Sequence, residues 1–579
     1  MQGRSVTNYH TLSHLVTFPK TSNAGATSHA RVGLHAPVVT TFLLTLYLLS
    51  GIIGHDPWKQ DEAYTFGMVL NILETGDWIV PTLAGQPFME KPPLFYIVAA
   101  FMANAFSPWL ALHDGARLAA VTFMALGVAF TGAAARSLYG ALAMPRAALL
   151  LVACFGLLLH AHEMITDTAL FAGFAVAIYG LTWAARNPLR AGACLGTGIG
   201  IGFMAKGLVE PAMIGLTCLV LPVVSPIWRT RGYAIALCWT ALFSLPWLLI
   251  WPAALYTVNP EAFATWFWTN NFGRFTGSAH LGADTESWYY TRVLPWFTFP
   301  AGPIAILTIL KWMRTRKSFD DSSTLLLIVV TGSTLVILTT AATARSLYAL
   351  PLLIPLSILA SRSVDSLPSR LSKYLSGVFG LVVATIAVLV WSIWLYGLEQ
   401  GHPPQFQLLL AWLPGDFRFE FHQGFFGLAL VATLLWMYVW LSRRARATAL
   451  HRWVAGVTMV WAVTMSLCLP WIDRAKSFRE PFSEIAALIP QDACVAGTGL
   501  GEPQRGMLHY FAGLVTTPPE SADEFCDYLI VQTNRRRELD HPPPPGWVPI
   551  WRGGRAGEAN EQFTLYERSE LADGRHRRS

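Results

Sequence analysis

The stretch "EKPPLFYIVAAFMANAFSPWL", residues 90–110, decides the topology of this chain and with it the fold. It opens on an adjacent acid and base, Glu90 and Lys91, which two prolines follow. The remainder, 93–110, is apolar and about as long as a transmembrane helix. If this segment crosses a membrane, every later loop changes sides, so the rest of the sequence has to determine whether it does.

The composition is that of a polytopic membrane protein. The 579 residues are 53% hydrophobic and only 13% charged, with 23 Trp and 33 Phe, whereas a soluble domain carries about 25% charged residues. This composition excludes disorder for most of the chain and favours many apolar helices. The net charge of +6 is modest, and we expect membrane lipids but no nucleic acid as partners.

Thirteen apolar runs other than 93–110 are candidate membrane spans. They lie at 36–54, 117–135, 147–162, 168–185, 191–205, 208–225, 233–254, 293–310, 324–341, 347–361, 376–396, 425–441 and 453–471. If the N-terminus is inside and 93–110 is not a span, the cationic clusters fall in cytoplasmic loops, as the positive-inside rule requires. If 93–110 is a span, those clusters all move outside. We therefore predict that 93–110 is a helix at the outer interface or dipping into the bundle.

This topology divides the chain into three predicted parts. Residues 1–35 form a cytoplasmic tail, 36–471 form the transmembrane part and 472–579 form an external soluble domain. Two long external loops, 55–116 and 255–292, interrupt the transmembrane part.

The predicted soluble domain has the pattern of a small α/β unit. The runs "ACVAGTG", "YLIVQT" and "FTLYERS" favour strands, and Pro481–Ile489 favours a helix. Cys494 and Cys526 lie in this region, and they can form a disulfide if it is outside the cytoplasm. Two cysteines alone leave the bonded and free states equally open.

Ionisable side chains gather at the outer ends of the predicted spans. Taken singly they have simple explanations: an interfacial lysine snorkels, Asp167 caps a helix and His280 lies in a loop. Together they favour a site for a phosphate-bearing substrate, because cations neutralise a leaving phosphate and a carboxylate orients or deprotonates the attacking group. The set is Asp61, Glu62, Glu90, Lys91, Glu163, Asp167, Lys206, Glu210, Arg274, His280 and Arg345.

At these residues the sequence resembles the GT-C membrane glycosyltransferases. The likeness is to the bacterial branch of aminoarabinose transferases (ArnT type), which modify lipid A and are related to protein O-mannosyltransferases. Five motifs carry it in order across about 36–361: "QDEAY…TGDWIVPTLAGQPFMEKPPLFY", "HEMITDTALF", "GFMAKGLVEP", "NPEAFATWFWTNNFGRFTG…WYY" and "ARSLYALPLLIPLSILA". The resemblance implies a mainly α, polytopic GT-C fold of about 13 transmembrane helices, with periplasmic interfacial helices and a small C-terminal α/β periplasmic domain.

The resemblance also implies roles for the matching residues. Asp61 would be the catalytic carboxylate and Asp167 a second acid that supports the site. The phosphate of a polyprenyl-phosphate sugar would be bound by Lys91, Lys206, Arg345 and Tyr348.

Further residues match positions around this site. Glu90 and His280 match positions that hold a zinc ion in such enzymes, with a structural role for the Zn²⁺. Glu62 and Arg274 are additional site candidates. Two departures from the family pattern bear on the acceptor: Thr65 stands where the family has a tyrosine, with Tyr64 one place earlier, and Arg345 stands where relatives often have lysine.

The sequence therefore predicts a glycosyltransferase of the bacterial inner membrane, with its active site and C-terminal domain on the periplasmic side. It would move a sugar with inversion from an undecaprenyl-phosphate donor to a lipid, glycan or protein acceptor, such as lipid A or another glycolipid. One alternative is an enzyme of the protein O-mannosyltransferase type. A lipid-linked sugar flippase is the alternative of another class. A transporter should show internal repeats and ionisable residues near span centres, and the one-sided charges favour an enzyme instead.

Overall fold

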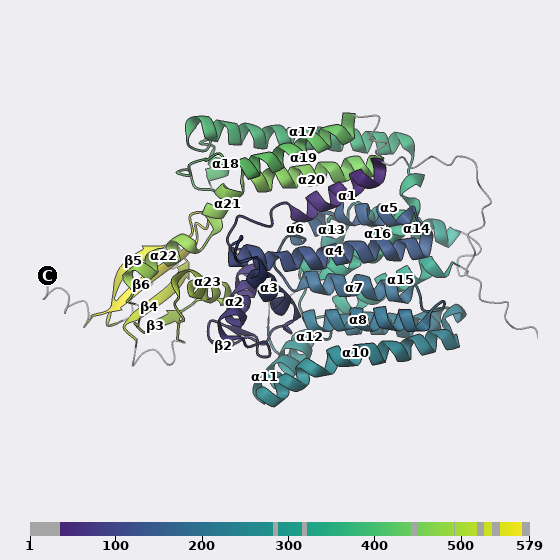
Figure 1. The fold of residues 1–579 in the computed structure, drawn as a ribbon, viewed down its shortest axis with the longest axis horizontal. Coiled ribbons are helices and arrows are strands. Elements are labelled where there is room, and N and C mark those ends of the chain that lie inside the picture. The colour runs from purple at the N-terminus through teal and green to yellow at the C-terminus, as the bar shows by residue number, and fades with distance from the viewer. Residues whose placement is uncertain are drawn as a thin grey trace, which may run out of the picture.

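The computed structural model describes residues 35–281, 286, 288–314, 321–410, 412–441, 448–490, 492–517, 526–534 and 545–569. Most of them form a bundle of roughly parallel helices, and a small mixed sheet with its own helices lies at one end of the bundle (Figure 1). The first loop, with the short helices α2 (Gln60–Thr75) and α3 (Leu94–Phe106), lies between the bundle and the sheet.

Each of the thirteen predicted ranges overlaps at least one helix of the bundle. These helices are α1 (His35–Leu49), α4 (Leu112–Tyr139), α5 (Ala143–Val152), α6 (Phe155–His160), α7 (Asp167–Leu181), α8 (Pro188–Lys206), α9 (Val209–Val224), α10 (Arg231–Val258), α13 (Tyr289–Phe297), α14 (Ala301–Arg314), α15 (Ser322–Thr340), α16 (Leu353–Ser363), α17 (Ser369–Gln400), α19 (Gln423–Leu441) and α20 (Ala449–Leu467). The range 147–162 is not one continuous helix, because the backbone is extended at Cys154 and the Phe155 N–H donates to the Phe299 carbonyl.

The described residues contain six helices that are long and apolar enough to cross a membrane, or up to eight if two bent pairs are counted. One pair is α13 with α14, bent by 98°, and the other is α20 with α21 (Leu469–Lys476), bent by 63°. Only 22% of the apolar window of α17 and 17% of that of α19 is buried within the protein, so their remaining apolar surface needs lipid. The chain is a multi-pass membrane protein, as predicted.

The segment 93–110 holds the helix α3, which has 13 residues. At about 1.5 Å per residue it is roughly 20 Å long, shorter than the ~30 Å hydrocarbon core. It packs mainly against α4 and α2, with a smaller contact to α8. The segment is therefore helical, as predicted, and its helix is too short to cross the membrane.

The C-terminal region contains a four-stranded sheet in the order β3-β4-β6-β5. Its strands are β3 (Val495–Thr498), β4 (Tyr528–Asn534), β5 (Trp547–Gly553) and β6 (Glu561–Arg568). β3 and β4 are parallel and the other pairs antiparallel, with Ile530 opposite Leu565 in the centre. Cys494 and Cys526 form a disulfide just before β3 and β4. The strands predicted from the sequence are thus all present.

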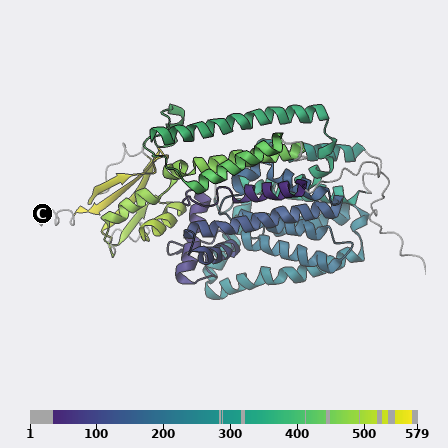
Figure 2. The same ribbon diagram turned by 45° about the horizontal axis from the view of Figure 1, so that its top comes forward.

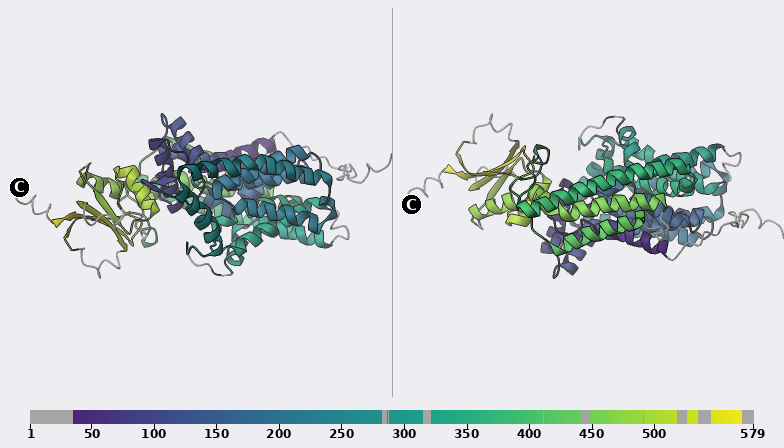
Figure 3. Two further views of the ribbon diagram at one scale, coloured as in Figure 1. Left: turned by 90° about the horizontal axis from the view of Figure 1, so that it is seen from below. Right: turned by 90° about the horizontal axis from the view of Figure 1, so that it is seen from above.

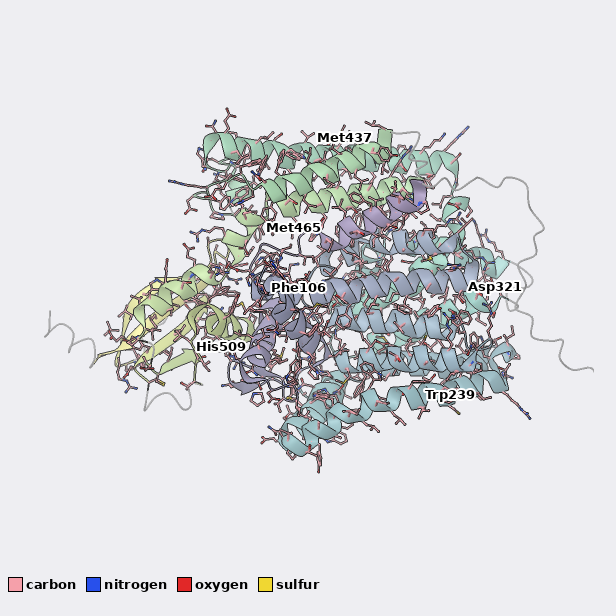
Figure 4. The ribbon with its side chains drawn as sticks, viewed as in Figure 1. Phe106, Trp239, Asp321, Met437, Met465 and His509 are labelled. Atoms are coloured by element: carbon pink, nitrogen blue, oxygen red, sulfur yellow. A yellow bond between two sulfur atoms is a disulfide. The ribbon has the colours of Figure 1, made fainter. Side chains whose placement is uncertain are left out.

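Two helices, α22 (Arg479–Leu488) and α23 (Glu502–Ala512), accompany the sheet, and α23 lies against α2 (Figures 2 and 3). Phe66 of α2, Phe482 of α22 and Met507 of α23 belong to the same buried apolar cluster. His509 marks this boundary, whereas Asp321 lies at the opposite end of the bundle (Figure 4). The sheet region and the first loop therefore share one core.

Candidate active site

Six of the predicted site residues lie at ends of elements or in loops near this boundary. Asp61 is in the first turn of α2, where a carboxylate is favoured by the helix dipole. Lys91 follows the hairpin β1 (Thr82–Leu83) and β2 (Gln86–Pro87). Asp167 begins α7, Lys206 ends α8, and Arg345 and Tyr348 lie at the start of the 3₁₀ segment η4 (Ser346–Leu352).

Asp61 and Arg345 form a two-pronged ion pair. Arg345 Nη1 donates to Asp61 Oδ1 at 3.2 Å, and Nη2 donates to Oδ2 at 2.5 Å. Burial alone would raise the pKa of Asp61, but the charges of Lys91 and Arg345 outweigh it and hold that pKa below its usual value. The carboxylate is therefore ionised at neutral pH, and both of its oxygens are engaged.

Lys91 is buried, with only 7% of its surface exposed. Its ammonium donates to the hydroxyl of Tyr64 at 2.7 Å, and no salt bridge of Lys91 occurs within the described residues. Burial would lower the pKa of Lys91, but Glu90 and the other nearby acids raise it overall. Lys91 is thus a buried cation whose direct partner is a neutral group, which leaves its charge available to an anion.

Lys206 connects the bundle helices α7 and α8 to η4. Its ammonium forms an ion pair with Asp167 and lies 4.0 Å from the ring centroid of Tyr348. Gly207 ends α8 with φ of 68°, and a Cβ there would lie 2.1 Å from Asn271 Oδ1. The glycine therefore permits both the turn after Lys206 and the close approach of Asn271 from the loop 255–292.

Glu90 forms an ion pair with Arg274 of α12 (Arg274–Thr276), at 2.5 Å between Oε1 and Nη1. Burial would raise the pKa of Glu90, but Lys91 and Arg274 lower it. This pair joins the first external loop to the segment after the π-helical turn η2 (Thr265–Gly273). Arg274 therefore lies beside Glu90, next to Lys91.

The described residues do not fit a zinc site. The Glu90 carboxylate is held by Arg274, and His280 is exposed on a backbone with φ of 49°. Within the part of the chain that the structure describes, no three His, Cys, Asp or Glu side chains are grouped so that they could hold a metal ion. A protein zinc site needs at least three such ligands. A structural zinc ion stays a prediction.

Glu62 is not part of this cluster. It is fully buried on the other side of α2, where its Oε1 accepts from Arg117 Nε at 2.6 Å. Glu163 accepts from Lys59 at 2.5 Å and contacts His160, and Glu210 is buried in α9 beside Gly202. The structure therefore separates these acids from the ones that surround Lys91.

Tyr64 is the residue that sequence reasoning left out of the site. Its hydroxyl accepts from Lys91 and its ring lies beside Phe88. The motif "QDEAY" offered the signal, because Tyr64 lies one turn after Asp61 on the same helix face.

The cluster carries an excess of positive charge. Among the residues that the structure describes, its four cations, Lys91, Lys206, Arg274 and Arg345, face three carboxylates, Asp61, Glu90 and Asp167. One cation is therefore unbalanced, and an anionic group such as a phosphate would complete the charge balance. Carboxylates beside that phosphate position would contact an incoming nucleophile.

Comparisons with known proteins find related sequences. No family model matches the chain. It is 26% identical over 424 residues to the undecaprenyl phosphate-alpha-4-amino-4-deoxy-L-arabinose arabinosyl transferase 1 of Pseudomonas fluorescens (strain Pf0-1), covering 69% of this chain and 70% of that protein. It is 25% identical over 461 residues to the corresponding transferase of Yersinia enterocolitica, covering 76% and 77%.

Among solved structures, the chain is similar to ArnT from Cupriavidus metallidurans bound to undecaprenyl phosphate. The TM-score is 0.65 at 16% sequence identity, and the match covers 91% of this chain and 97% of that one. The fold is thus that of ArnT, and the predicted resemblance to ArnT-type GT-C glycosyltransferases is confirmed.

Proposed function

We propose, from this similarity to ArnT, that the chain is an integral-membrane glycosyltransferase. It moves a sugar from undecaprenyl phosphate to an acceptor on the periplasmic side, such as lipid A or another glycolipid. The curated relatives are named for undecaprenyl-phosphate-dependent transfer of an aminoarabinose. The observation that carries the proposal is Lys91, a buried cation with a neutral partner in a cluster that has one positive charge in excess.

The donor phosphate would bind to Lys91, Lys206 and Arg345, with Tyr348 beside Lys206. The acceptor oxygen attacks the anomeric carbon, and the bond from that carbon to the phosphate oxygen breaks. The phosphate leaves with the electron pair, and the cations stabilise its added negative charge. A single displacement of this kind inverts the anomeric centre.

Asp61 orients the acceptor and takes its proton when the acceptor is a hydroxyl. A phosphate acceptor is already ionised and needs only orientation. Because both Asp61 oxygens are bound to Arg345, the donor phosphate competes with Asp61 for that guanidinium. Asp167 holds Lys206 in place through their ion pair.

The chain is further proposed to cross the inner membrane thirteen times, with the cluster, the interfacial helix α3 and residues 472–579 in the periplasm. The tail 1–35, of which residues 1–34 lie outside the described part of the chain, is then in the cytoplasm, and 36–471 forms the membrane part. The Cys494–Cys526 disulfide supports this orientation, because disulfides persist in oxidising compartments. Lys311 and Arg362 belong to the opposite end of the bundle, which Asp321 marks (Figure 4). The positive-inside rule favours the cytoplasm for that end.

The test is sugar transfer from radiolabelled undecaprenyl-phosphate sugars by membranes containing the protein. Wild type is compared with Asp61→Asn, Lys91→Ala and the control Lys311→Ala, which removes a lysine at the opposite end. Label that moves into lipid with wild type and control alone supports the proposal, and label in protein favours the O-mannosyltransferase type. Movement of intact donor across sealed vesicles without transfer would instead identify a flippase. Equal transfer by all variants would overturn the site.

A further inference from the structure

A buried polar network joins the C-terminal region to the helix that carries Asp61. It begins at Asp56, just before α2, which is 4% exposed. Arg479 Nε donates to Asp56 Oδ2 at 2.9 Å, and the hydroxyl of Ser477 donates to the same oxygen at 2.6 Å. The Asp56 N–H donates to Asp473 Oδ1 at 2.8 Å. Residues 473–479 therefore hold the chain immediately before α2.

The network continues into the bundle through His113 at the start of α4. His113 Nε2 lies 3.6 Å from Asp56 Oδ1, and Nδ1 lies 3.0 Å from the hydroxyl of Tyr510 on α23. The next residue, Asp114, accepts from Arg117 Nη1 at 2.7 Å and from the Gly54 N–H at 3.1 Å.

Arg117 completes the connection to α2. Its guanidinium is fully buried, and it donates from Nε to Glu62 at 2.6 Å and from Nη1 to the Ile52 carbonyl at 3.3 Å. Glu62 is the residue directly after Asp61. A buried charge that loses its partner is strongly destabilising. The Arg117–Glu62 pair therefore fixes the position and the rotation of α2 relative to α4.

Helix α23 also approaches α2 closely at two glycines, with the Leu83 side chain beside both of them. A Cβ on Gly67 would lie 3.1 Å from the Gly506 Cα, and one on Gly506 would lie 3.4 Å from the Ala63 carbonyl oxygen. Tyr510 packs edge to face on Phe66 of α2, with 4.7 Å between ring centroids. The C-terminal region thus supports the face of α2 opposite the cluster.

We propose that Asp56, Arg479 and Tyr510 are positioning residues for the transfer reaction, acting through α2 on Asp61. The inference rests on the proposed function and names a role for the C-terminal region in it. Asp61 and Tyr64 project from the same rigid helix, so a small rotation of α2 moves both groups relative to the cations. Misplacement of a reacting group by about 1 Å costs on the order of 10²-fold in rate.

The test compares kcat and the KM for the donor in purified full-length protein, normalised to folded protein. Asp56→Asn and Arg479→Ala should lower kcat by about 10- to 100-fold, with donor KM changed much less, because the cations that bind phosphate are not on α2. Arg479→Lys should restore part of kcat. Tyr510→Phe removes one hydroxyl but keeps the ring, and should lower kcat several-fold in a protein that folds normally.

Glu558→Gln is the matched control, because it breaks the 2.8 Å Lys476–Glu558 pair next to this network without touching Asp56 or α2. It should leave kcat unchanged. If Tyr510→Phe and Arg479→Lys both retain wild-type kcat, or if every variant only reduces the yield of folded protein, the positioning role is overturned. No transfer by the wild type would be a failure of the proposed function instead.

Discussion

Arg345 binds both carboxylate oxygens of Asp61 across 284 residues of sequence. An acid held in this way is ionised, oriented and occupied at once. It becomes available to an acceptor only when another anion draws the guanidinium away. Under the proposed function the donor phosphate is such an anion, so this ion pair would link donor binding to the readiness of Asp61.

The first prediction concerns this ion pair. Arg345→Gln should raise donor KM and lower kcat together, by about tenfold or more in kcat/KM, because one charged hydrogen-bonding partner is lost. Arg345→Lys keeps the charge without the two-pronged geometry and should give an intermediate value. Steady-state transfer assays would measure both.

Arg362→Gln is the matched control for Arg345→Gln. Each arginine side chain is 45% exposed and pairs with one aspartate, but Arg362 pairs with Asp321 at the far end of the bundle. A similar loss in both variants would mean that any surface ion pair matters and that Arg345 has no special role.

The second prediction concerns pH. Burial raises the pKa of Asp61, whereas Lys91 and Arg345 bring it below its usual value. Transfer by the wild type should therefore persist as pH falls, until pH drops below the ordinary aspartate value of about 4. In Arg345→Gln the effect of burial remains while one opposing charge is lost, so the acid limb should move to higher pH. An acid limb that stays in place would contradict this assignment.

The third prediction separates Lys91 from Tyr64. Lys91→Ala should reduce transfer by about 10²- to 10³-fold and abolish binding of undecaprenyl phosphate itself. Tyr64→Phe removes only the hydroxyl that accepts from Lys91, and it should weaken binding several-fold. Equal binding of undecaprenyl phosphate by wild type and Lys91→Ala would exclude Lys91 as its ligand.

The fourth prediction concerns Glu90 and Arg274. Glu90→Gln removes the charge that pairs with Arg274 and should lower transfer through a misplaced loop. Because that carboxylate is occupied by the guanidinium, the loss should be equal with and without a chelator. Metal analysis of the purified protein provides an independent check, and stoichiometric zinc that disappears in Glu90→Gln would show that this carboxylate binds metal.

The sequence predicted the helices better than the contacts between them. Each of the thirteen apolar ranges overlaps a helix, because the length of an apolar run is a local property. The segment 93–110 was set apart from the spans because the charges of the loops constrain the topology. The partners of the site residues are not local: Arg274 meets Glu90 across 184 residues, and Arg117 meets Glu62 across 55.

Residue type alone also could not show which acid of α2 faces the cations. Asp61 and Glu62 are neighbours with the same charge, yet one faces the cations and the other is buried against Arg117. The helical turn of about 100° between successive residues separates them, but the direction of each depends on which elements flank α2. Helix α23, some 440 positions later, is one of them.

The contact between Gly67 and Gly506 limits how this protein can be recombined with its relatives. A chimera that exchanges only the C-terminal region would bring a foreign helix against an unchanged α2, where a side chain in place of Gly506 would meet Leu83 and backbone atoms of α2. Exchange of that region together with the first loop keeps both halves of the contact from one parent. In chimeras made to change acceptor specificity, the first loop and the C-terminal region should therefore come from the same parent protein.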